Sequence, residues 1–160
     1  MFKIGDKLVY PMHGAGVVEK IEDKFILGEL RSYYIIQVLH GRMQVMVPVK
    51  GSEQVGLRAI TDHSGIKLMM DTLSAASTAM DDNWNRRNRS NMDKLKTGKI
   101  EQVAEVVRNL MRMDKVKKLS TGEKKLLNNA RQILAGEIAL VENVTEDEAA
   151  AMIDDAVNRC

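Results

Sequence analysis

Cysteine is almost missing from this sequence, since its single example, Cys160, is the last of 160 residues. An intrachain disulfide and a cysteine-based metal site are therefore excluded, and a reducing compartment fits the composition. No run approaches the ~18 apolar residues that a membrane-spanning helix needs. The amino terminus carries charge at Lys3 and Asp6 before any apolar run develops, and we expect no targeting segment there. We expect an untargeted cytoplasmic protein without a membrane partner.

Proline is equally scarce, and its distribution divides the chain at about residue 60. Both prolines fall within the first 50 residues, where β-branched and aromatic residues form short runs at 7–10, 16–21, 32–39 and 43–49. Beyond residue 60 the apolar spacing changes to three and four, which is typical of helices. The sequence therefore predicts an α+β protein, with a small antiparallel β-barrel over residues 1–60 and an all-α domain over residues 61–160.

One helix of this second half is strongly amphipathic. Apolar residues recur on a single face between Ile100 and Met111. The pattern turns Arg108 outward, together with the other charged residues of that segment. We therefore expect Arg108 to be solvent-exposed.

Three further segments carry the signals of a helix start. In a capping box, a hydroxyl and a carboxylate three residues later bond each other's free backbone amides. Asp81, Asp82 or Asn83 can cap a helix whose first turn holds Trp84, because short polar side chains accept bonds from free amides. Two pairs have capping-box spacing: Ser120 with Glu123, and Thr145 with Glu148.

A heptad of apolar residues runs through the last third of the chain. This repeat allows either a dimerising coiled coil or packing inside a helical bundle. Leu127, Ala130 and Leu134 broaden the stripe, and Gly136 weakens a coiled coil, so core packing is the better interpretation and we expect a monomer. The repeat consists of Leu119, Leu126, Ile133 and Leu140.

The net charge of the whole chain is small, but short stretches carry a strong excess of one sign. The formal net charge is +2. Residues 83–96 carry five basic side chains against one acidic one, and residues 115–131 carry six against one. Residues 137–155 carry seven acidic side chains and no lysine or arginine, so they mask this polarity in the total. The two basic stretches favour an anionic partner for the helical half.

Catalytic and cofactor-binding patterns are missing. The glycine-rich loop at 11–16 has no phosphate-binding spacing, and Thr97-Gly98-Lys99 lacks the earlier glycine of a nucleotide-binding loop. His13, His40 and His63 are far apart and show neither helical metal-ligand spacing nor a paired carboxylate. We therefore expect no enzyme, no cofactor and no metal.

Trp84 is the most informative residue, because its neighbours in sequence are almost all polar or basic. A buried tryptophan normally lies within an apolar pattern, so exposure is one interpretation. An exposed ring flanked by Arg86, Arg87 and Arg89 suits a wedge in DNA, in which the arginines hold phosphates and the ring packs against an unstacked base. The other interpretation is that Trp84 packs into a groove between helices and the arginines are merely solvated.

The chain carries a set of short motifs: IGDKLVYP at 4–11 followed by HGAG at 13–16, WNRR at 84–87, VAEVVR at 103–108 and LSTGEK at 119–124. Together these motifs resemble those of the CarD family of bacterial transcription regulators. Only the first motif is shared with the polymerase-binding module of transcription-repair coupling factors.

The resemblance implies a Tudor-like amino-terminal module that grips a lobe of the RNA polymerase β subunit, and a helical domain that lies on promoter DNA. It further implies that Trp84 wedges into the minor groove at the upstream edge of the transcription bubble and stabilises the open promoter complex. Arg86, Arg87 and Arg89 match basic residues that hold the DNA backbone.

The resemblance departs from the family at two positions on the polymerase side. Lys24 and Met46 stand where members often carry arginine, so a bidentate guanidinium contact is lost at both. We expect Lys24 to act as a point charge and Met46 to point outward between Val45 and Val47. A rival interpretation is a protein-protein adaptor that joins RNA polymerase to another partner without touching DNA.

Overall fold

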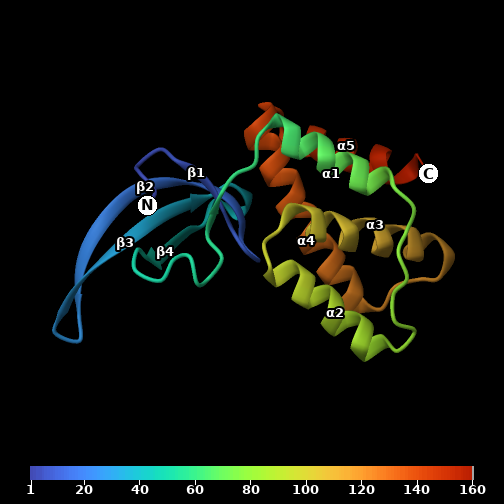
Figure 1. The fold of residues 1–160 in the computed structure, drawn as a ribbon, viewed down its shortest axis with the longest axis horizontal. Coiled ribbons are helices and arrows are strands. Elements are labelled where there is room, and N and C mark those ends of the chain that lie inside the picture. Colours follow the sequence, from blue (N-terminus) through green and yellow to red (C-terminus); the bar gives the residue numbers. More distant parts are fainter. Residues whose placement is uncertain (160) are drawn as a thin grey trace.

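The computed structural model describes residues 1–159 and consists of an antiparallel sheet followed by five helices (Figure 1). The predicted α+β class is therefore confirmed. We call residues 1–60 the strand module and residues 61–159 the helical module. The strands are β1 (Lys7–Tyr10), β2 (Gly14–Ile26), β3 (Glu29–Val38), β4 (Gln44–Pro48) and β5 (Arg58–Ala59), with a short 3-10 turn, η1 (His40–Arg42), before β4.

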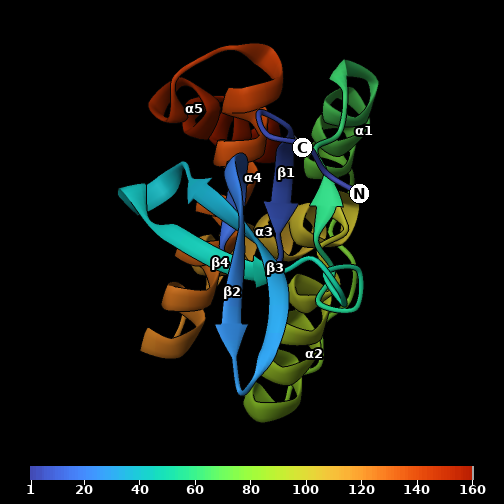
Figure 2. The same ribbon diagram turned by 90° about the vertical axis from the view of Figure 1, so that its left-hand side faces the viewer.

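The sheet has the order β4-β3-β2-β1-β5, with every neighbouring pair antiparallel. Figure 2 shows how the sheet curls. A small apolar core of the strand module includes Leu8, Tyr34, Ile36 and Val47. β2 and β3 continue past the predicted ends and form a long hairpin that closes at Leu27 and Gly28. Both of these residues have positive φ, which suits a two-residue hairpin turn.

The helices begin where the polar caps predict. The Asn83 side chain accepts a bond from the Arg86 amide, and Thr145 forms a complete capping box with Glu148. Ser120 also caps its helix, but Glu123 directs its carboxylate to Arg87 and to the Ser120 hydroxyl. The helices are α1 (His63–Ser74), α2 (Trp84–Lys96), α3 (Ile100–Val116), α4 (Thr121–Glu142) and α5 (Glu146–Asn158).

The helical module has one continuous core, to which all five helices contribute. Leu119, Leu126 and Ile133 of the heptad lie in it, in agreement with packing inside a bundle. The prediction that Arg108 turns outward was wrong, because its side chain is buried. It donates hydrogen bonds to the Thr72 carbonyl oxygen at 2.9 Å and to Oγ1 of Thr78, in the segment after α1, at 3.2 Å.

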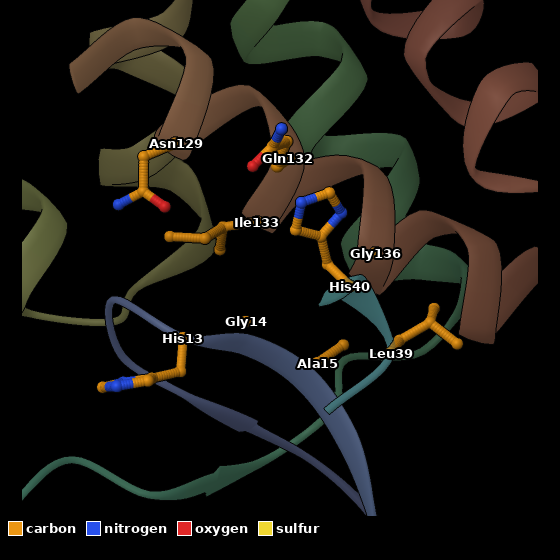
Figure 3. A pocket seen from close by; sticks show the side chains of 9 residues that line it. All are labelled: His13, Gly14, Ala15, Leu39, His40, Asn129, Gln132, Ile133 and Gly136. Carbon is orange, nitrogen blue, oxygen red and sulfur yellow. The ribbon is translucent and has the colours of Figure 1, made fainter. Parts of the chain in front are cut away.

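The two modules meet along the start of β2 and the middle of α4 (Figure 3). Gly14 and Ala15 of β2 face Ile133 and Gly136 of α4 across a cavity of about 20 Å³, which has room for one water molecule at most. On another side of the same joint, a Cβ atom added to Gly98 would lie 2.8 Å from Cγ of Pro11. The modules are therefore in close contact and leave no cleft between them here.

An ion pair between a partly exposed arginine and a buried glutamate crosses this joint. Arg58 of β5 donates two hydrogen bonds, of 2.9 and 2.7 Å, to the Glu137 carboxylate on α4, and the Thr61 amide donates a third of 2.8 Å. The Arg58 Nε also donates to the Gly98 carbonyl oxygen at 2.7 Å. The segment 56–65, which leads from the strand module into α1, is thus tied to α4 and to Gly98.

Candidate nucleic-acid interface

Trp84 is the first residue of α2, and it lies against the start of α4. Its indole Nε1 donates a hydrogen bond of 2.8 Å to Oγ of Ser120, while 45% of the residue remains exposed. The ring therefore has one edge fixed on the helical module and a free apolar surface. This position lies between the two sequence interpretations, since the residue is neither fully exposed nor enclosed in a groove.

Arg87 differs from the prediction that it holds DNA phosphate. Its side chain is buried, and its Nε and Nη2 donate to the Glu123 carboxylate at 3.0 and 2.8 Å. Its Nη1 donates to the carbonyl oxygens of Asp81 and Asp82. These hydrogen bonds from Arg87 hold the pKa of Glu123 below its usual range. Because its donors are directed inward, Arg87 joins α2 to α4 and is not part of the accessible basic surface.

Arg86 and Arg89 are on the accessible surface of α2, as a phosphate contact requires. Arg86 is exposed over 70% of its side chain and makes only a loose ion pair with Asp81, with 3.6 Å between Nε and the carboxylate oxygen. Exposed pairs of this kind are weak, so either arginine can turn toward a nearby phosphate. The side chain of Arg86 is two residues from Trp84 along the chain.

The structure brings a second basic segment to the same place. The hydrogen bond between Trp84 and Ser120 sets the end of the α3–α4 loop beside the indole. Lys117 and Lys118 are exposed in that loop. Lys125 of α4 lines a shallow depression together with Asn88 of α2. The charge count alone singles out residues 115–131, but only the tertiary contact shows that Ser120, at the end of the loop with Lys117 and Lys118, meets Trp84.

Lys24 and Met46 lie on one face of the strand module. Cross-strand partners share a face, and faces alternate along each strand. Lys20, Ile35 and Met46 form one row across β2, β3 and β4, and Lys24 lies on the same face, four residues beyond Lys20. Both Lys24 and Met46 are exposed, whereas Val47 is buried, which confirms the outward direction of Met46. β4 is an edge strand, with β3 as its only partner.

An apolar surface next to Lys24 has no counterpart in the sequence predictions. The tip of the β2–β3 hairpin exposes Phe25, Leu27 and Leu30, and Leu27 is 96% exposed. The alternation of apolar and polar residues along each strand does not predict this exposed apolar surface, because both strands extend beyond the core before they reach the turn. We call these three residues the hairpin tip.

The three histidines remain separate. His40 lies 3.5 Å from Glu146 and His63 lies 2.7 Å from Glu142, each at the surface of the joint region. Within residues 1–159, no three histidine, cysteine, aspartate or glutamate side chains are grouped as a metal site would require. Over the same residues, no helix has the length and apolarity needed to cross a membrane.

A strand module fixed to a helical module that carries a half-exposed tryptophan beside basic residues defines a two-module protein with a candidate DNA surface. Residues 2–61 match the family model of the CarD-like/TRCF RID domain, and residues 68–154 match that of the CarD C-terminal domain. The chain is also 42% identical over 148 residues to a Bacillus subtilis (strain 168) protein described as "Putative transcription factor YdeB", covering 92% of this chain and 97% of that protein. The chain belongs to the CarD family.

Membership confirms the resemblance drawn from the sequence motifs and gives the protein a role in transcription. The RID family implies an interaction with RNA polymerase. The family consists of transcription factors and is not a known class of enzyme. The antiparallel sheet is consistent with the Tudor-like module that the resemblance implies.

Proposed function

We propose that this protein binds the RNA polymerase β subunit through its strand module and stabilises the open promoter complex by inserting Trp84 into the minor groove at the upstream edge of the bubble. The observation that carries the proposal is the half-exposed indole at the start of α2, fixed at one edge and flanked by accessible basic side chains. An apolar ring fits between bases that are already unstacked, and the cations beside it bind phosphates.

The geometry supports a wedge that works from a tether. Unstacking a base step costs a few kcal/mol, which a small basic surface does not offset at cellular salt. A strand module bound to polymerase keeps the helical module near the promoter at high effective concentration. Because the ring fits the melted junction and not closed duplex, it shifts the equilibrium toward the open state.

On the polymerase side, the candidate contact is the face that carries Lys24 and Met46 beside the free edge of β4. Lys24 offers a point charge to an acidic lobe, and its nearest ion pair, to Glu22 at 3.9 Å, is loose and exposed. Met46 offers a flexible apolar contact. Loss of the guanidinium at both positions reduces the geometric specificity of this contact compared with arginine-bearing members.

Open-complex lifetime tests the proposal. Lifetimes are measured with RNA polymerase of the same organism, without added protein, with the wild type and with Trp84→Ala. We expect the wild type to lengthen the lifetime and Trp84→Ala to shorten it roughly tenfold, which corresponds to about 1.4 kcal/mol of differential binding. Leu68→Ala is the matched control, because it removes another exposed apolar side chain of the helical module. If the open-complex lifetimes with the wild type and with Trp84→Ala are equal, and both proteins bind polymerase, the proposed insertion of Trp84 is wrong.

The hairpin tip favours a second candidate, an adaptor that joins polymerase to another protein without DNA contact. Phe25, Leu27 and Leu30 present an apolar surface suited to a protein partner. The two functions differ in Trp84 fluorescence, because quenching by forked DNA requires the ring to meet bases. A ring that forked DNA leaves unchanged supports the adaptor.

A further inference from the structure

We propose that Ser120 is a positioning residue, which fixes the direction of the Trp84 ring and is itself held by the buried pair of Glu123 and Arg87. This inference rests on the proposed function, since it concerns how the wedge is kept ready for DNA. It assigns a role in that function to three residues of the helical module that do not themselves need to touch nucleic acid.

The hydrogen bonds form a closed circuit between α2 and α4. Trp84 Nε1 donates to Ser120 Oγ at 2.8 Å, and the Ser120 hydroxyl donates to Glu123 Oε1 at 3.2 Å. Arg87 then donates to both oxygens of Glu123 at 3.0 and 2.8 Å. Arg87 follows Trp84 by three residues on the same helix, so the circuit returns to its origin. Movement of the indole away from α4 breaks the circuit at one bond.

Every hydrogen-bonding position of the Ser120 hydroxyl is occupied. A serine hydroxyl offers one donor and two acceptor positions. Its donor faces Glu123, and its acceptors receive the Glu123 backbone amide at 3.2 Å and the Trp84 indole. Gly122 also lies beside the ring, since a Cβ atom there would be in ordinary van der Waals contact, 3.8 Å from Cζ2 of Trp84. The serine is therefore fully committed, and the indole has one defined acceptor.

A half-exposed ring needs such a bond to keep one orientation. Tryptophan side chains in a core are fixed by packing on all sides, but nearly half of Trp84 faces solvent. If the ring is ordered before it meets DNA, the entropy of ordering it is lost during folding and not during binding. The hydrogen bond to Ser120 thus favours insertion without adding a contact to DNA.

The competing explanation is that Ser120 only caps α4. Thr145 is the matched control, because its hydroxyl caps α5 in the same way and its circuit contains no tryptophan. Glycine at an N-cap position costs only a few tenths of a kcal/mol compared with serine or threonine. Ser120→Gly and Thr145→Gly therefore each weaken one helix start only slightly, and only Ser120→Gly removes the acceptor of the indole.

Two measurements on these variants test the role of Ser120. Trp84 is the only tryptophan, so time-resolved fluorescence anisotropy of the free protein reports on this ring alone. We expect Ser120→Gly to increase the amplitude of subnanosecond ring motion about twofold and to shorten the open-complex lifetime roughly fivefold, the factor that one neutral hydrogen bond of ordinary strength represents. Thr145→Gly should match the wild type in both, and Ser120→Thr, which keeps the hydroxyl, should restore both.

The outcomes separate the positioning role from the wedge itself. If the ring in Ser120→Gly is as rigid as in Thr145→Gly, the positioning role is overturned. A looser ring with an unchanged lifetime overturns it as well, provided that Trp84→Ala still shortens the lifetime. If Trp84→Ala has no effect, the proposed function fails, and with it any role of Ser120 in transcription, whatever the anisotropy shows.

Discussion

Two arginine–glutamate ion pairs differ in what they connect: one joins two helices of the same module, and the other joins the two modules. Arg87 and Glu123 join α2 to α4 within the helical module, and Arg58 and Glu137 join the strand module to α4. Both pairs are bidentate, and both glutamates are buried. The arginines differ in exposure, which is 9% for the Arg87 side chain and 28% for that of Arg58.

The comparison shows that the same kind of ion pair connects helices within one module and connects one module to the other. The free-energy cost of removing two charges from water offsets most of their mutual attraction. A buried pair therefore adds little net stability compared with apolar residues of the same volume. A bidentate pair does fix direction, because two parallel hydrogen bonds tolerate little rotation. We infer that the inner pair fixes the setting of one side chain, Trp84, and the outer pair fixes the angle between two modules.

The largest expected effect comes from breaking the inner pair. Arg87→Met leaves the Glu123 carboxylate buried without its cation, and we expect it to lower the free energy of unfolding by about 3–5 kcal/mol. Urea unfolding followed by far-UV circular dichroism measures this loss. The double variant Arg87→Met with Glu123→Leu removes both charges and should recover most of the stability. A loss below about 1 kcal/mol in the single variant, as for an exposed pair, would contradict the buried geometry.

A smaller effect on stability, but a larger one on shape, is expected from the outer pair. Arg58→Met should cost about 3 kcal/mol, the lower end for a broken buried pair, because Arg58 is partly exposed and the Thr61 amide still bonds Glu137. It should also broaden the distribution of distances between the modules. Double electron-electron resonance measures that width between spin labels on Glu53→Cys and Asn128→Cys, in a Cys160→Ser background.

The control for this experiment is an exposed pair of the strand module. Arg31→Met breaks the contact between Arg31 and Glu29, in which both side chains are more than half exposed. We expect it to change neither stability nor the distance distribution, since exposed pairs contribute little. An equally narrow distribution in Arg58→Met and the wild type would mean that the packing of β2 on α4 fixes the joint without the ion pair.

The smallest effect is the acid sensitivity that the inner pair introduces. Hydrogen bonds from Arg87 lower the pKa of Glu123 in the folded protein, whereas a free glutamate titrates near pH ~4.3. As pH falls, the unfolded chain therefore takes up this proton first. The resulting stability is complete above the unfolded pKa and is lost as pH falls toward the folded pKa, by at most about 1.4 kcal/mol per pH unit for one carboxyl group.

Urea unfolding between pH 5.5 and pH 3.5, on the order of one unit on either side of the free carboxyl value, measures this dependence. Glu123→Gln cannot titrate, so its stability should fall less steeply with pH than that of the wild type. Asp155→Asn removes an exposed carboxylate of α5 and should keep the wild-type slope. Equal slopes in Glu123→Gln and the wild type would show that the pKa of Glu123 is not lowered by folding.

Local sequence signals predicted the parts of the fold that depend on neighbours in the chain. The strands follow β-branched runs, and the starts of α2, α4 and α5 follow Asn83, Ser120 and Thr145, because a cap and its amides lie within three residues. The β2–β3 hairpin was predicted too short. Its outer part has no core to bury, so the apolar alternation on which the prediction rested is lost there.

The candidate site was predicted in outline and missed where it depends on distant partners. Trp84 and Arg86 are found where their polar context suggested, but Arg87 and Arg108 are buried against the expectation for charged residues. The partner of Arg87, Glu123, is 36 residues away. One usable signal existed for Arg87, since it lies four residues before Asn91 and eight before Leu95 on the buried stripe of α2.

The hairpin tip has a consequence for how this protein changes over evolutionary time. Phe25, Leu27 and Leu30 belong to neither apolar core of the described residues, so we expect their replacement to leave folding intact. We therefore expect selection on the fold to act on Arg87, Glu123 and Gly98, but not on these three residues of the hairpin tip. We therefore expect sequence changes at the hairpin tip among relatives to reflect changes in the partner that the tip contacts. Such changes can be compared between lineages independently of changes in the two cores.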